Sequence, residues 1–280
     1  MTRFDPNHYL FALYFNMVPD SQRGNIVPLL VSGTYGIANY NSGYTSDGFH
    51  TIYCTNHLST GYFFSSRTML ELSRDGYTGL AYQLLLNTNF PSWLYSVVNG
   101  ATTCWEGWNA YLSGPQNPAA PSDDRGYYYV QPTWDPFTSL NHLPLGASAE
   151  WILKVIGGIN PDDTNPGFQN VIIKPEPNNA ITNCFAAFNS IHGPIVCTWT
   201  NNVSTSTYTL AFTNPANTTA TVYFPTTNNL AGIMESGRSA TTAPGVIFYY
   251  PTNWPNWTNG ATVFQVGSGG FRFSLTNVIF

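Results

Sequence analysis

Residues 62–86 read YFFSSRTMLELSRDGYTGLAYQLLL, and this stretch decides how the first half of the chain folds. Apolar side chains recur at helical spacing on both sides of the turn Arg74-Asp75-Gly76. Residues 62–73 and 77–86 are therefore predicted to be helices. Because the turn between them is short, the two helices should pack antiparallel as an αα-hairpin.

More helices are predicted on both sides of this hairpin. Residues 8–17 show the same spacing of apolar side chains, and Pro19-Asp20 then indicates a break followed by a new helix. A last helix is predicted over residues 141–159, with Gly157-Gly158 as its C-terminal stop. The first part of the chain should thus be a set of packed helices.

After residue 164 the spacing of apolar residues changes from the helical period to the alternation typical of strands. Gly, Asn and Pro separate the short predicted strands, as in a β-sandwich. These strands cover residues 171–173, 185–188, 195–199, 208–212, 221–224 and 271–275. The predicted fold is α+β and multidomain, with a helical domain over residues 1–164 and an antiparallel β-sandwich over residues 165–280.

The composition is that of a globular protein with unusually few charges. Hydrophobic residues make up 43% of the chain but charged residues only 8%, against about 25% in an average domain. The net charge is −5 with nine Lys and Arg, which argues against nucleic acid as a partner because phosphate binding needs a basic surface. No apolar run is long enough to span a membrane, so no membrane partner is expected.

The neutral, Asn- and Thr-rich composition suits a secreted protein that handles carbohydrate. Candidate glycosylation sequons begin at Asn202, Asn217 and Asn256. The residues after Met1 lack the apolar core of a signal peptide. We therefore expect an extracellular protein whose natural N-terminus is absent from this chain.

The four cysteines include no CxxC pair, so no structural zinc site is predicted. No cofactor is predicted either, and the sequence shows no dense cluster of oxygen ligands of the kind that binds calcium. Cys184 and Cys197 flank a turn near residues 190–193 and could lie opposite each other on a hairpin. They are the candidate disulfide, given an oxidising compartment. Cys54 and Cys104 are expected to be free, buried thiols.

Glu106 stands out among the carboxylates because it lies between Trp105 and Trp108 in the segment ATTCWEGW of residues 101–108. Sugar sites combine aromatic rings that pack on the C–H face of a pyranose with carboxylates for proton transfer. The alternative is a buried, hydrogen-bonded Glu surrounded by structural tryptophans. Glu71 and Glu150, in contrast, are expected on exposed helix faces.

An ordered series of motifs over more than a hundred residues resembles the inverting α-L-rhamnosidase family. The series begins with HLSTG at 57–61, LELSRDG at 70–76, AYQLL at 81–85 and PSW at 91–93. It continues with NGATT at 99–103, WE at 105–106, SLNH at 139–142 and PGF at 166–168. The resemblance implies the C-terminal part of a six-hairpin α/α toroid, followed by the family's C-terminal β-sandwich.

The resemblance also implies an activity and roles for individual residues. The Glu of the family's Thr-Thr-x-Trp-Glu motif is the general base, here Glu106, and the His of its Ser-Leu-Asn-His motif contacts the rhamnose hydroxyls, here His142. The same pocket would be lined or shaped by His57, Thr60, Trp93 and Trp105. The implied reaction is hydrolysis of terminal α-L-rhamnosyl residues with inversion, on rhamnose-containing glycosides or polysaccharides.

The chain departs from the family pattern at the general acid. The family carries this residue in an Asp-Gly-x-x-Arg motif far upstream of the Trp-Glu motif, whereas the nearest strings here, at Asp47 and Asp75, lack the Arg and lie close to Glu106. We therefore expect a fragment or an incomplete gene model. The alternatives are a truncated, non-catalytic carbohydrate-binding relative and a chain that acts only with a separately encoded N-terminal half.

Overall fold

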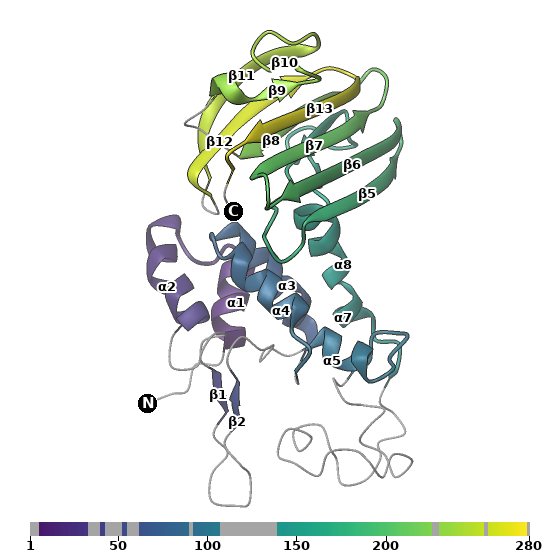
Figure 1. The fold of residues 1–280 in the computed structure, drawn as a ribbon. Helices are drawn as coiled ribbons and strands as arrows, with labels where there is room; N and C mark the ends of the chain where they lie inside the picture. The colour runs from purple at the N-terminus through teal and green to yellow at the C-terminus, as the bar shows by residue number, and fades with distance from the viewer. Residues whose placement is uncertain are drawn as a thin grey trace, which may run out of the picture. The chain divides into compact units, whose positions relative to one another are not determined.

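The computed structural model describes residues 6–32, 40–42, 52–54, 62–89, 92–106, 139–225, 230–254 and 257–278. The chain divides into two compact units, Met1–Ser148 and Ala149–Phe280. The first is mainly helical and the second mainly β, and they are called the helical unit and the β unit below (Figure 1). The division falls earlier in the chain than the predicted boundary near residue 164, because the last helical turns are grouped with the β unit.

The helical unit contains the predicted αα-hairpin. α3 (Tyr62–Arg74) and α4 (Thr78–Leu86) pack against each other, and Gly76 between them has a φ of 91°, which suits a residue without a Cβ. The bounds of the remaining elements of this part are α1 (Pro6–Tyr14), α2 (Asp20–Ser32), β1 (Tyr40–Ser42), β2 (Ile52–Cys54) and α5 (Trp93–Val98). α1 ends before the predicted Met17, because the chain reverses at Asn16, where φ is 52°.

Side chains of α1, α2 and α3 form the core of the helical unit. Leu10 and Leu13 of α1, Leu30 of α2, and Met69 and Leu72 of α3 are each at most 1% exposed. Full burial of a side chain of this size contributes about 1.5–3 kcal/mol. These contacts join segments that are far apart in the sequence, since α1 packs against both α2 and α3.

An ion-pair network links α2 to the end of α3. Nη2 of Arg23 donates to Oδ2 of Asp75 at 2.7 Å and to Oε2 of Glu71 at 3.1 Å, and Nε donates to Oδ1 of Asp75 at 3.0 Å. Arg74 lies 3.4 Å from the other oxygen of Glu71. The Glu71 side chain is only 5% exposed. The prediction of an exposed helix face for Glu71 was therefore wrong, because Arg23 pairs with it across the helix contact.

The predicted helix over residues 141–159 was wrong as a single regular helix. The structure has two short helices, α7 (Leu143–Gly146) and α8 (Ser148–Trp151), followed by the π-helix η2 (Ile152–Ile156). The wider π-turn is closed by Gly157, whose N–H donates to the Ile152 carbonyl at 2.8 Å. The predicted Gly-Gly stop is confirmed. Gly158 has a φ of 74°, and a Cβ there would lie 2.4 Å from the nitrogen of Pro175.

The β unit is built from two sheets, and all six predicted strands lie within strands of the structure. One sheet has six strands in the order β10-β9-β13-β7-β6-β5, and the other has five in the order β11-β12-β8-β4-β3. The six are β5 (Asn183–Ser190), β6 (Gly193–Asn202), β7 (Thr207–Asn214), β9 (Met234–Glu235), β10 (Arg238–Ser239) and β13 (Gly269–Thr276). The five are β3 (Ile159–Pro161), β4 (Asn170–Ile173), β8 (Thr219–Pro225), β11 (Val246–Trp254) and β12 (Trp257–Val266). A 3-10 turn, η3 (Leu230–Gly232), precedes β9.

One strand pair departs from the predicted antiparallel arrangement. β4 and β8 run parallel, with Val171 opposite Ala220 and Ile173 opposite Val222. The chain between them passes through β5, β6 and β7 of the other sheet, and a long crossover of this kind is what a parallel pair requires. The other strand pairs within the described residues are antiparallel.

Aromatic side chains from both sheets fill the core of the β unit. The ring of Phe264 on β12 lies 4.9 Å from that of Phe273 on β13, and Phe224 on β8 lies 5.4 Å from Tyr208 on β7, measured between ring centroids. Trp199 on β6 is 1% exposed, and its Nε1–H donates to the Ile156 carbonyl at 2.7 Å. This bond ties the end of the π-helix to the six-stranded sheet.

The hairpin of β11 and β12 was missed by the sequence prediction. β11 contains Pro251 and lies at the edge of its sheet, where its residues are exposed on both faces. β12, in contrast, is buried continuously from Gly260 to Phe264. Neither strand therefore shows the alternation of apolar and polar residues by which a half-buried strand is recognised.

The predicted disulfide between Cys184 and Cys197 was wrong, because both are free thiols. The turn between β5 and β6 is where it was predicted, with Ser190 opposite Gly193. In that register Cys184 lies opposite Trp199, and Cys197 lies opposite Ala186. The two cysteines are thus diagonal neighbours on one face, about 7–8 Å apart, which is too far for a disulfide without movement of the backbone.

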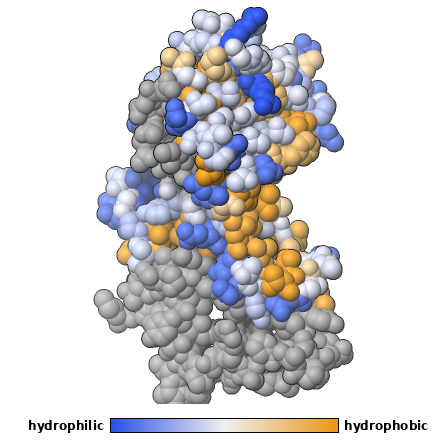
Figure 2. Space-filling view, viewed as in Figure 1, coloured by the Kyte–Doolittle hydropathy of each residue, from blue (hydrophilic) through white to orange (hydrophobic). Residues whose placement is uncertain are grey.

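The surface of the β unit reflects the low content of charged residues. Figure 2 shows that most residues on its visible face are pale, between the hydrophobic and the strongly hydrophilic extremes, with strongly hydrophilic ones scattered among them. Among the described residues, no helix has the length and hydropathy needed to cross a membrane.

Candidate active site

Two segments that are distant in the sequence, residues 101–106 and 139–142, lie side by side in the helical unit. The N–H of Glu106 donates to the Ser139 carbonyl at 2.9 Å, and the N–H of His142 donates to the Cys104 carbonyl at 2.6 Å. The Thr103 hydroxyl donates to the Leu140 carbonyl. These bonds bring the predicted Trp-Glu and Ser-Leu-Asn-His motifs together.

The carboxylate of Glu106 is held at this junction. Its Oε2 accepts the N–H of Ser139 at 2.9 Å and lies 3.8 Å from Nδ1 of His142. Within the described residues Oε1 accepts no hydrogen bond. The Glu106 side chain is 37% exposed and that of His142 is 18% exposed. One carboxylate oxygen is thus fixed by the backbone, and solvent reaches the side chain.

This arrangement determines what Glu106 can do chemically. A hydrogen bond from a backbone N–H to an ionised carboxylate is stronger than one between neutral groups, and it fixes the direction of the side chain. The oxygen that is not held can then accept a proton from a water molecule within hydrogen-bonding distance. The alternative of a buried Glu enclosed by structural tryptophans does not describe Glu106, since more than a third of its side chain is exposed.

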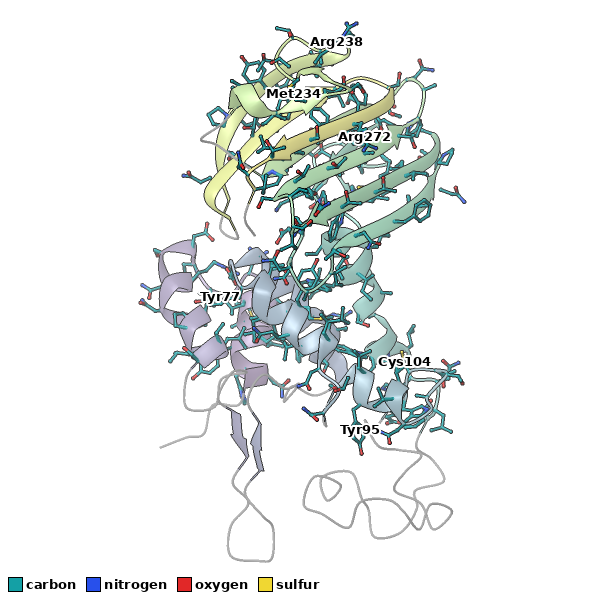
Figure 3. The ribbon with its side chains drawn as sticks, viewed as in Figure 1. Tyr77, Tyr95, Cys104, Met234, Arg238 and Arg272 are labelled. Atoms are coloured by element: carbon teal, nitrogen blue, oxygen red, sulfur yellow. The ribbon has the colours of Figure 1, made fainter. Side chains whose placement is uncertain are left out.

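His142 is positioned by the start of α7. It is the N-cap residue of that helix, with extended backbone dihedrals, and its own N–H is bound to the Cys104 carbonyl. Cys104, labelled in Figure 3, lies in the turn that leads to Glu106. Its Sγ would lie 3.8 Å from a Cβ built on Gly146, at the other end of α7. α7 therefore packs directly on the segment that carries Glu106.

Trp93 and Trp105 are buried beside this junction, at 8% and 5% exposure. Nε1 of Trp93 donates to the Leu145 carbonyl of α7 at 3.1 Å. α5, which begins at Trp93, is capped by Ser92, whose hydroxyl accepts the N–H of Tyr95. Trp93 thus connects α5 to α7. The predicted contacts of both tryptophans with substrate stay predictions.

Several predicted features fall on parts of the chain that the structure does not describe. His57 and Thr60, which were predicted to lie around the pocket, are outside the described residues. The same is true of the Cys54 side chain, of Asn256 and of residues 107–138. Of the other sequons, Asn202 and Asn217 are both exposed. The side chain of Asn202 accepts the Ser204 hydroxyl at 2.7 Å, within its own sequon.

The described carboxylates of the helical unit differ in their surroundings. Glu71 and Asp75 are engaged by Arg23, and Asp20 lies in the first turn of α2. Of these four described carboxylates, only that of Glu106 lies near a histidine, His142, at 3.8 Å. Within the described residues, no group of three or more His, Cys, Asp or Glu is arranged to hold a metal ion. Arg23 was missed by the sequence analysis, since no local pattern reveals a partner on another helix.

Comparison with protein families identifies both halves of the chain. Residues 6–156 match the bacterial α-L-rhamnosidase six-hairpin glycosidase domain, and residues 158–238 match the bacterial α-L-rhamnosidase C-terminal domain. The predicted recognition and fold class are therefore confirmed: a partial six-hairpin domain is followed by a β domain of two sheets.

Individual relatives agree with this assignment. An α-L-rhamnosidase of Streptomyces avermitilis is 31% identical over 271 residues, which is 95% of this chain and 21% of that protein. One from Formosa agariphila is 34% identical over 174 residues, covering 62% of this chain and 17% of that protein. A crystal structure of the Streptomyces avermitilis α-L-rhamnosidase complexed with L-rhamnose matches with a TM-score of 0.70 and 27% identity, covering 96% of this chain and 21% of that one. This chain spans about a fifth of the length of these relatives, and it belongs to the bacterial α-L-rhamnosidase family.

Proposed function

We propose that this chain supplies the water-activating half of an α-L-rhamnosidase site, with Glu106 as the general base. The reaction is hydrolysis of terminal, non-reducing α-L-rhamnosyl residues with inversion, on rhamnose-containing glycosides or polysaccharides. The observation that carries the proposal is the placement of Glu106: Oε2 is held by the N–H of Ser139, and His142 lies 3.8 Å away. Membership of the family supports the same role.

Each step of the proposed reaction needs a group in a defined position. Water attacks the anomeric carbon of the rhamnosyl residue from the face opposite the leaving group, and Glu106 accepts the proton that the water loses. The bond from the anomeric carbon to the glycosidic oxygen breaks, and a carboxylic acid on the other side protonates that oxygen. The product sugar therefore has the opposite anomeric configuration.

His142 is proposed to bind the hydroxyls of the rhamnosyl residue. Its backbone is fixed by the N-cap position of α7 and by the bond to the Cys104 carbonyl. Nδ1 faces the Glu106 carboxylate, so a sugar that His142 binds would also lie near the base. Because the backbone of His142 is fixed, only its two side-chain torsions remain to be ordered when it binds a ligand.

The second carboxyl group of the inverting pair is proposed to come from outside the described residues. Of the described carboxylates in the helical unit, Glu71 and Asp75 are committed to Arg23, and Asp20 begins α2. If the chain is a fragment, the rest of the enzyme carries this acid. If the chain acts with a separately encoded N-terminal half, that half carries it. We also propose that the protein is extracellular and that its partner is a rhamnose-containing glycoside or polysaccharide.

The proposal can be tested with substrates that differ in their need for the acid. The leaving group of 2,4-dinitrophenyl α-L-rhamnoside departs without protonation, so its hydrolysis depends on the base, whereas methyl α-L-rhamnoside needs both groups. We expect the 280-residue chain to hydrolyse the dinitrophenyl substrate and to release β-L-rhamnose first, as followed by NMR. Methyl α-L-rhamnoside should react at least about 10²–10⁴-fold more slowly than in a site with both groups.

The matched variants are Glu106→Gln and Glu150→Gln, which each replace one carboxylate by an amide. Glu150 pairs with Lys154 at 45% exposure, in the β unit. Glu106→Gln should lower turnover of the dinitrophenyl substrate by about 10²–10⁴-fold, and Glu150→Gln should leave it unchanged. Equal turnover by the parent and Glu106→Gln would rule out the base. Binding of L-rhamnose without turnover of either substrate would instead favour the non-catalytic carbohydrate-binding alternative.

A further inference from the structure

The outer face of the five-stranded sheet carries a row of aromatic side chains. The register places Tyr223 of β8 opposite Val263 of β12, and Val263 opposite Tyr250 of β11. Phe264, the next residue on β12, packs on Phe273 of the other sheet, so Val263 points to the opposite, outer side. Val263 is nevertheless only 1% exposed. Tyr223 and Tyr250 are its neighbours on this face, one on each side.

A second row lies directly beside the first. Phe248 of β11 is opposite Gln265 of β12, which is opposite Thr221 of β8. The rings of Phe248 and Tyr250 are stacked, with centroids 6.4 Å apart and an interplanar angle of 19°. Phe248 is 52% exposed and Tyr250 is 45% exposed. Two nearly parallel rings on the edge strand thus present an open aromatic surface.

Amide and hydroxyl groups next to these rings are already oriented by one another. The Thr221 hydroxyl donates to Oε1 of Gln265 at 2.8 Å, and Nε2 of Gln265 donates to Oδ1 of Asn170 at 3.1 Å. Nδ2 of Asn170 donates to Asp162 at 2.9 Å and to Thr221 at 3.0 Å. This chain of bonds fixes the amides beside the aromatic rings, which lowers the entropy lost when a ligand binds.

The charges around this face are few and opposed. Nζ of Lys174 lies 5.6 Å from the centre of the Tyr223 ring and 3.6 Å from Oε1 of Glu176. Asp162 is bound by Thr164 and Asn170. The rings and the amides between these two positions are neutral. A strongly acidic or basic ligand would therefore gain little here, whereas a ligand with hydroxyls and apolar C–H faces matches the surface.

We infer that Phe248, Tyr250 and Tyr223, with Gln265 and Asn170 beside them, form a binding surface for a neutral polysaccharide. Aromatic rings pack on the C–H faces of pyranose units. Gln265 keeps one N–H and one oxygen lone pair with which to bind a hydroxyl at the ring edge, and Asn170 holds that amide in place. All five of these residues belong to the β unit, whereas Glu106 belongs to the helical unit. A surface of this kind would keep a glycosidase of this family on a polymeric substrate between cleavage events.

Affinity electrophoresis of the full 280-residue chain tests this inference. Native gels contain galactomannan, xyloglucan or mixed-linkage β-glucan as neutral probes, and polygalacturonate as the charged probe. We expect at least one neutral polysaccharide to retard the protein. Phe248→Ala and Tyr250→Ala should each weaken the retardation about 3- to 10-fold in affinity, and Tyr250→Phe should retain most of it.

The matched control is Phe185→Ala on β5, because Phe185 is 71% exposed but lies on the other sheet. Phe185→Ala should leave the retardation unchanged. Glu106→Gln should also leave it unchanged, and this result would show that polysaccharide binding does not depend on the proposed base. Circular dichroism spectra and melting temperatures identify any variant that fails to fold. The inference is overturned if no neutral probe retards the chain, if only polygalacturonate does, or if folded Phe248→Ala and Tyr250→Ala proteins bind as the parent does.

Discussion

The backbone nitrogen of Ser139 lies 2.9 Å from Oε2 of Glu106, although 33 positions separate the two residues in the sequence. The reciprocal bond, from the N–H of Glu106 to the Ser139 carbonyl, is also 2.9 Å long. Two bonds in opposite directions fix both the backbone and the side chain of Glu106. The position of the proposed base therefore depends on the segment that also carries His142.

Replacement of His142 by Ala should lower kcat/KM for 2,4-dinitrophenyl α-L-rhamnoside by about 10- to 100-fold. This is the effect of losing one or two hydrogen bonds to the substrate, each worth about 1–1.5 kcal/mol. His192→Ala, in the turn between β5 and β6, is the control and should have no effect. If His142→Ala retains full kcat/KM in steady-state assays, His142 does not contact the sugar.

Replacement of Arg23 by Met should destabilise the helical unit by about 2–4 kcal/mol. It leaves Asp75 without its ion-pair partner at 12% exposure and Glu71, at 5% exposure, with Arg74 alone. Breaking a buried pair costs about 3–5 kcal/mol, and the pair with Arg74 offsets part of that loss. Lys154→Met is the control, because the Lys154–Glu150 pair is 35–45% exposed and should contribute only about 0.3–0.5 kcal/mol. Urea unfolding monitored by tryptophan fluorescence measures both changes. Equal effects of the two variants would contradict the importance of the Arg23 network.

Replacement of Trp93 by Phe should lower stability by about 1–3 kcal/mol, because it removes the donor to the Leu145 carbonyl and leaves a small cavity. The carbonyl keeps the Ser148 hydroxyl, which lies 3.1 Å away, so complete unfolding is not expected. Thermal melts and titration with L-rhamnose distinguish two roles for Trp93. Unchanged stability with weaker rhamnose binding would show that Trp93 contacts the sugar and does not position α7.

Addition of a reducing agent should not change the melting temperature of the folded chain, because Cys184 and Cys197 are free thiols. Burial raises the pKa of the Cys197 thiol, as does the neighbouring Cys184. Cys197 should therefore react with a thiol reagent such as 5,5′-dithiobis(2-nitrobenzoic acid) only after unfolding. Peptide mapping after labelling identifies the modified residues. A fall in melting temperature on reduction would reveal a disulfide after all.

Asp162 should make the stability of the β unit depend on acid pH. Hydrogen bonds from the Thr164 hydroxyl, the Asn170 side chain and the Thr164 backbone lower the pKa of Asp162 below its usual 3.8. The contribution of Asp162 to the stability of the β unit is complete above the usual pKa of an Asp. It is lost as the pH falls through the lower pKa that Asp162 has in the folded protein. The melting temperature of Asp162→Asn, compared with the parent between about pH 6 and pH 2, should show less of this loss. Parallel profiles for the two proteins would exclude a contribution from Asp162.

The residue pattern predicted the elements whose burial follows a simple period. The hairpin of α3 and α4 and the six short strands were all placed correctly, because their apolar residues recur at helical spacing or form short runs that Gly, Asn and Pro separate. The pattern failed where burial is uniform, as in β12, or where both faces are exposed, as in β11. It also failed at residues 141–159, where a break at Ala147 and a π-helix interrupt the helical period.

The sequence by itself determined the family, the two-part organisation and the identity of Glu106 and His142 as candidates, because these depend on residue types in a fixed order. Only the tertiary structure decided which groups meet. Ser139 donates a hydrogen bond to Glu106, Arg23 pairs with Glu71, and Cys184 lies diagonal to Cys197 on the neighbouring strand and not opposite it. The first outcome depends on two irregular segments that meet, the second on packing between helices, and the third on strand register. A shift of one residue in a strand changes the partner of every side chain on it.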